Sequence, residues 1–174
     1  MRWCLVVTGA LLAASPAGAQ QLANPDSVTL AGYQRVLIGM RDTVESLSAR
    51  ANDLRRDLQT AGEPTVLNRA DRLVQACRAT RDAFTTVRPT IAGWPLPERA
   101  HPHRDSLFTA MRGLTEHIVT DCLRGLDPNG PGQRADTLRA WVPYRTSELG
   151  QATTLYHGAA ARLARSLGID LTRR

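Results

Sequence analysis

The stretch LAGYQRVLIGMRDTVESLSARANDLRRDL, residues 30–58, decides the fold. Its apolar residues recur at alternating steps of three and four, which is the spacing of one face of an α-helix. This heptad pattern is also typical of coiled-coil packing. A helix over residues 27–60 would be about 50 Å long and would need partner helices along its length. The stripe consists of Leu30, Tyr33, Leu37, Met40, Val44, Leu47, Ala51, Leu54 and Leu58.

Three further stripes with this spacing predict three further helices. The second follows Glu63-Pro64, and Pro89 predicts its end, because a residue before proline is biased away from helix. The third opens near His101 and ends at Gly125, and the fourth closes around Gly168. The stripes are Val66, Ala70, Leu73, Cys77, Thr80, Phe84 and Val87; Leu107, Met111, Leu114, Ile118 and Cys122; and Leu138, Val142, Arg145, Leu149, Ala152, Tyr156, Ala159 and Leu163.

The predicted fold is all-α, an antiparallel up-and-down four-helix bundle with a kinked fourth helix. Pro143 should kink that helix or split off a short leading piece. The segment DPNGPG, residues 127–132, predicts the loop before it. No segment shows sustained alternation with a period of two, so we expect no sheet.

The first residues have the pattern of a secretory signal peptide. Arg2 precedes an apolar run over residues 5–14, Pro16 breaks it, and Ala17-Gly18-Ala19 resembles a cleavage site. The run is about half the length that a membrane-spanning helix needs. We therefore predict a signal peptide at residues 1–19, a single domain over residues 20–174 without a transmembrane segment, and a periplasmic or extracellular location.

Cleavage of this leader would remove Cys4 and leave Cys77 and Cys122. An even pair of thiols in an oxidising compartment is expected to form a disulfide. In an antiparallel hairpin of the second and third helices, Cys77 should face a residue between 113 and 123. The Cys77–Cys122 disulfide is therefore predicted, with a stabilisation of about 4 kcal/mol from loop closure.

Every basic residue is arginine, and the formal net charge is +6. Because acids are interspersed with the arginines, we favour a solvated, ion-paired surface over an anion-binding face, and we expect no nucleic-acid partner. The absence of lysine excludes Schiff-base and phosphate-loop chemistry. His117 and Asp121 lie one turn apart, which predicts a hydrogen-bonded pair beside the disulfide.

Few candidates for cofactor binding are present, and the leading interpretation has no cofactor. Neither His117 nor His157 has a glutamate three residues earlier, so the di-iron motif is absent. Met40 and His157 would lie at a similar height and could ligate a haem. His101 and His103 could hold a metal ion, although a solvated loop is the favoured interpretation.

Two tryptophans beside prolines are candidates for interaction. Trp94 stands in Gly93-Trp94-Pro95-Leu96-Pro97, a predicted extended connection that either binds a partner or covers the end of the core. Trp141 stands near the start of the fourth helix, where it either plugs the bundle or contacts a partner.

The leading functional hypothesis is a non-catalytic interaction module of the cell envelope, with an unknown protein or envelope component as partner. Its long helices could instead pair in a homodimer. The alternative class is a carrier of haem or metal through the residues named above. An enzyme ranks third, because the sequence nominates no pair of nucleophile and base.

Overall fold

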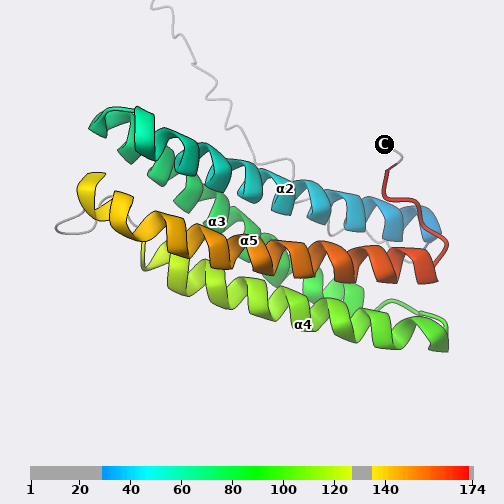
Figure 1. Cartoon of the computed structure of the whole chain (residues 1–174). Coiled ribbons are helices and arrows are strands. Elements are labelled where there is room, and N and C mark those ends of the chain that lie inside the picture. Colours follow the sequence, from blue (N-terminus) through cyan, green and yellow to red (C-terminus); the bar gives the residue numbers. More distant parts are fainter. Residues whose placement is uncertain (1–28, 127–134, 173–174) are drawn as a thin grey trace, which may run out of the picture.

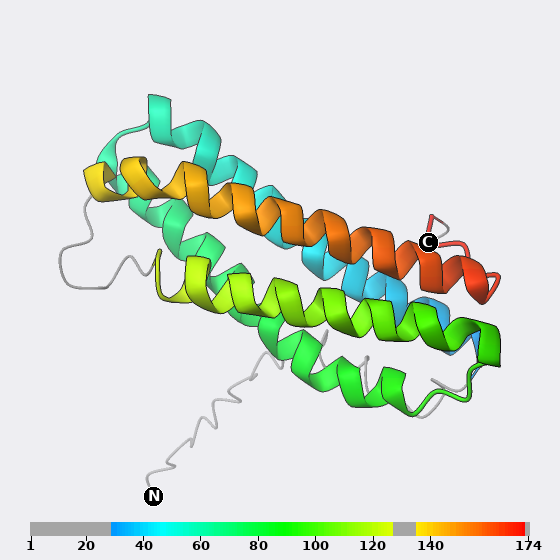
Figure 2. The same ribbon diagram turned by 60° about the horizontal axis from the view of Figure 1, so that its bottom comes forward.

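The computed structural model describes residues 29–126 and 135–172, and these residues are helical apart from short connections. Four long helices pack against one another: α2 (Leu30–Thr60), α3 (Glu63–Ala92), α4 (His101–His117) and α5 (Ala135–Ser166). Figures 1 and 2 show that consecutive helices run in opposite directions along a common long axis. The predicted leader and the DPNGPG loop lie outside the described residues.

Helix α2 follows the predicted apolar stripe closely. The Thr29 hydroxyl accepts a hydrogen bond from the backbone N–H of Gly32 (3.1 Å), which caps its first turn. All stripe residues except Leu30 are buried. Leu30 is exposed, since side chains of a helix lean toward its N-terminus and that of the first residue leans off the end of the bundle.

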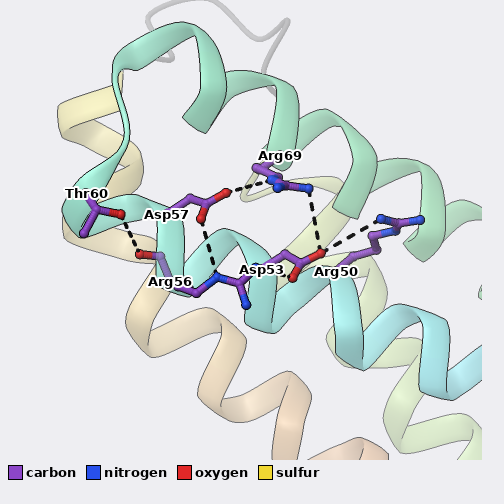
Figure 3. Close-up of polar contacts among 6 residues, drawn as sticks. All are labelled: Arg50, Asp53, Arg56, Asp57, Thr60 and Arg69. Carbon is purple, nitrogen blue, oxygen red and sulfur yellow. Dashed lines mark hydrogen bonds and ion pairs between the residues drawn. The ribbon is translucent and has the colours of Figure 1, made fainter.

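An ionic cluster joins α2 to α3 beside their connection (Figure 3). Arg69 of α3 lies 2.8 Å from the Asp57 carboxylate and 3.8 Å from that of Asp53. Arg50 and Arg56 approach Asp53 from α2 itself, at 4.0 and 2.7 Å. Asp53 and Asp57 are thus neutralised where α2 meets α3, as an interspersed charge pattern predicts.

The predicted end of the second helix before Pro89 is wrong, because α3 continues to Ala92 with Pro89 inside it. Pro89 stands in the last turn, where its missing N–H removes one helical hydrogen bond near an end that frays in any case. Val87 and Ile91 on either side are buried, so continuing the helix places both in the core.

The connection from α3 to α4 closes one end of the bundle. Trp94, Leu96 and Ala100 are buried there, and a 3₁₀ turn (Glu98–Ala100) leads into α4. The Trp94 ring packs on Tyr33 of α2 with a centroid distance of 4.3 Å. The predicted start of the third helix at His101 is confirmed.

The third helix changes its winding after His117. Residues Ile118–Leu123 form a π-helix, in which Arg124 donates to the Val119 carbonyl (3.1 Å). Leu114, Ile118, Cys122 and Leu126 are all buried and follow at steps of four. Such steps overshoot the 3.6 residues of an α-helical turn, and the wider π turn keeps these residues on one face. The third helix makes most of its contact with α3 through this segment.

Helix α5 is continuous through Pro143, so the prediction of a separate leading piece is wrong. Leu138 and Val142 before the proline and Leu149 after it are buried in the same core, which favours one helix through the position. The kink itself stays a prediction. Gly168, with φ of 70°, ends the helix where the sequence predicted.

The core is mainly aliphatic and extends along the bundle. Its aromatic centre is Tyr156, which stacks on Phe84 with a centroid distance of 5.3 Å. The buried threonines bond to carbonyls of their own helices, as Thr80 does to Ala76 (2.9 Å) and Thr146 to Val142 (2.7 Å). These buried hydroxyls therefore need no hydrogen-bond partner on another helix.

Candidate functional site

Cys77 and Cys122 form the predicted disulfide, which joins α3 to the π-helical end of the third helix. Their Cα atoms lie 6.5 Å apart, and both side chains are fully buried. A cysteine in a disulfide has no thiolate to offer to a metal or a substrate. Cys122 is therefore a structural residue.

A polar cluster beside the disulfide links the π-helix to α5. His117 Nδ1 lies 2.8 Å from the Asp121 carboxylate, which confirms the expected pair. Arg145 of α5 lies 3.5 Å from the same carboxylate and donates to the Thr120 carbonyl (3.1 Å). The cluster thus holds two elements together by charge-assisted hydrogen bonds.

Arg145 is the member of this cluster that the sequence did not assign. Its signal was present, because an arginine occupied a position on the otherwise apolar stripe of the fourth helix. The side chain is part-buried, and its guanidinium lies 5.5 Å from the centroid of the Trp141 ring. A charge on a core-facing stripe indicates a partner across the interface, here Asp121.

A groove of about 660 Å³ runs along the outside of the bundle between α4 and α5. Its walls include small residues such as Ala110 and Gly113 of α4 and Ala152 and Ala159 of α5. Leu155 borders it with 68% of its side chain exposed. The ionisable residues that line it are Asp105, His117, Glu148 and Arg162.

Few large apolar side chains of the described residues are exposed, and three of the four belong to α5. They are Trp141 (55%), Tyr144 (66%) and Leu155 (68%), the fourth being Leu30. Single exposed apolar residues are ordinary, whereas a group along one helix marks a contact surface. Sequence periodicity missed this surface, because these residues lie off the core stripe.

The two candidate tryptophans are placed differently. Trp94 is 4% exposed and covers the end of the core, which is one of the two roles expected for it. Its indole N–H has no hydrogen-bond partner. Trp141 lies on the surface of α5, where a partner could reach it.

Met40 and His157 occupy different environments. Met40 is buried on the core stripe of α2, and His157 is half-buried on α5 beside Tyr156. Burial lowers the pKa of His157, the neighbouring Arg41 lowers it further, and Glu45 opposes both. This favours the neutral imidazole, which is the form that ligates metals. Haem ligation stays a prediction, which an absorption spectrum of the native protein would test.

His101 and His103 lie in the first turn of α4. His101 Nε2 is 3.2 Å from the Leu96 carbonyl, so this ring closes the connection to α3. Within residues 29–126 and 135–172, no group of three or more histidine, cysteine or acidic side chains is arranged to hold a metal ion. Metal binding by these two histidines stays a prediction.

No family model matches the chain, and no curated protein or solved structure is significantly similar to it. None of the described helices is long and apolar enough to cross a membrane.

Proposed function

We propose that this protein is exported to the periplasm or the cell exterior and acts there as a non-catalytic interaction module of the cell envelope. The exposed apolar residues of α5 beside the α4–α5 groove carry the proposal. The surface defined by Trp141, Tyr144, Leu155 and the groove residues of α4 and α5 is named the α4–α5 face below. Exposed apolar side chains grouped along one helix beside a groove are a mark of a binding site for another protein.

The disulfide supports the exported location. Both sulfurs are buried in the core, and a structural disulfide persists in oxidising compartments. The signal-like residues 1–19 provide the route, and cleavage after Ala19 leaves an even number of cysteines.

A non-catalytic role is supported by the chemistry beside the groove. The His117–Asp121 pair has the geometry of a base and its orienting acid, but the neighbouring cysteine belongs to the disulfide. Arg145 uses the remaining carboxylate oxygen of Asp121 to hold α5. The cluster therefore serves packing between elements.

The test is photo-crosslinking in the native host. A photoreactive amino acid in place of Leu155 should give a covalent adduct with a protein of the envelope. The same amino acid in place of Arg78, which is exposed on α3, should give none and serves as the matched control. Absence of any adduct from position 155 would contradict the interaction role.

A further inference from the structure

The α4–α5 face carries a repeat of seven residues on α5. Trp141, Glu148, Leu155 and Arg162 follow one another at this interval, which is the period of helices that pack along each other. Over these three intervals an α-helix drifts by only about 60°, so the four residues share one side of α5. Glu148, Leu155 and Arg162 all line the groove.

The two charged residues in this repeat, Glu148 and Arg162, are unpaired among the residues that the structure describes. Glu148 and Arg162 make no ion pair with the other described residues. They are fourteen residues apart on one helix, or about 21 Å, so they cannot reach each other. Leu155 stands midway between them.

A two-fold axis through Leu155 satisfies both charges at once. In an antiparallel pair of α5 helices related by such an axis, facing residues have numbers with a constant sum. Glu148 of each copy then faces Arg162 of the other, while the Leu155 side chains meet at the axis. An isologous interface of this kind is the commonest way in which identical chains associate.

The groove accommodates this arrangement. The small residues Ala110, Gly113, Ala152 and Ala159 leave room at its walls for a side chain from outside. Two helices pack at 8–10 Å when the side chains between them are small. The two Leu155 side chains can thus meet at the axis and pack beside these small residues, covering side chains that are exposed in the single chain.

From this self-complementary pattern we infer that the α4–α5 face binds a second copy of this chain, with α5 antiparallel to α5 and the two-fold axis at Leu155. The inference rests on the proposed function in that it names the partner of the interaction module. A crosslinked adduct of Leu155 with a different protein would leave that function standing and overturn the second copy as its partner.

The test uses the disulfide-bonded protein, expressed from its full sequence, in sedimentation measurements over a range of concentrations. The native protein should form a dimer, and Leu155→Glu should raise its dissociation constant at least about tenfold. Thr154→Glu, at an exposed neighbouring position that does not line the α4–α5 groove, is the matched control and should leave the dimer unchanged. Unchanged thermal unfolding shows that both variants fold.

Charge reversal tests the register. Glu148→Arg and Arg162→Glu should each weaken the dimer, since like charges then meet at both ends of the interface. The double variant E148R/R162E should recover the native dissociation constant to within about threefold. Such recovery requires contact between copies, because the two positions are too far apart within one chain. The inference is overturned by a native protein that stays monomeric, by a dimer that Leu155→Glu leaves intact, or by a double variant no better than the single ones.

Discussion

The environment of individual residues depends on contacts that sequence patterns do not specify. Trp94 and Trp141 both stand beside prolines, yet one is buried against Tyr33 and the other lies on the surface beside Arg145. The difference arises because Trp94 follows the end of α3 and folds back over the core, whereas Trp141 lies off the core stripe of α5. Only the three-dimensional position of the stripes separates the two cases.

His157 should make stability depend on pH. Burial lowers its pKa in the folded protein below the ordinary value of 6.5. The unfolded chain therefore takes up the proton first as the pH falls, so stability is full above 6.5 and declines as the pH falls through 6.5 toward the folded-state pKa. Urea unfolding at several pH values should show this decline, and His157→Gln should reduce it. An equal decline in the variant would contradict the assignment.

At the scale of elements, the apolar periodicity predicted where the helices lie and missed local features such as the helix continuing through Pro89. The steps of three and four located all four helices, because a helix of this length must bury one face along its whole extent. Pro89 misled the prediction, since the tendency of one residue is outweighed by the burial of Val87 and Ile91. The π-helix was not predicted, because the steps of four from Leu114 to Leu126 are compatible with an ordinary helical stripe until the backbone is seen.

The connection between α3 and α4 should contribute to stability through Trp94. Truncation by Trp94→Ala removes a buried ring from against Tyr33 and should lower the free energy of unfolding by about 3–5 kcal/mol. The exposed Leu30, which lies off the α4–α5 face, provides the comparison, and Leu30→Ala should change the free energy of unfolding by less than about 0.5 kcal/mol. Trp94→Phe should cost less than the alanine variant, because it keeps a ring and removes the unpaired indole N–H.

Denaturant unfolding of the oxidised protein measures all three variants. Similar losses for Trp94→Ala and Leu30→Ala would show that the connection does not close the core.

At the scale of the molecule, the disulfide was predictable and the α4–α5 face was not. An antiparallel hairpin fixes which levels of two helices meet. The positions of Cys77, Cys122 and the connection between their helices were therefore enough to predict the disulfide. The groove depends on how far α4 and α5 separate on their outer side, and this is set by side-chain sizes in three dimensions. The heptad repeat through Leu155 becomes informative only once that side is known to be open.

If the protein is exported, we expect the native chain to lack its leader and to contain the disulfide. A chain that crosses a membrane loses its leader, and its two remaining thiols meet an oxidising environment. The middle of α3 and the π-helical end of the third helix are then covalently joined.

The most direct test is intact-mass spectrometry of the protein recovered from its natural location, with alkylation of free thiols before and after reduction. The account predicts a chain that begins at Gln20 and takes up two alkyl groups only after reduction. A chain that retains Met1, or one whose Cys77 and Cys122 are alkylated without reduction, would contradict it.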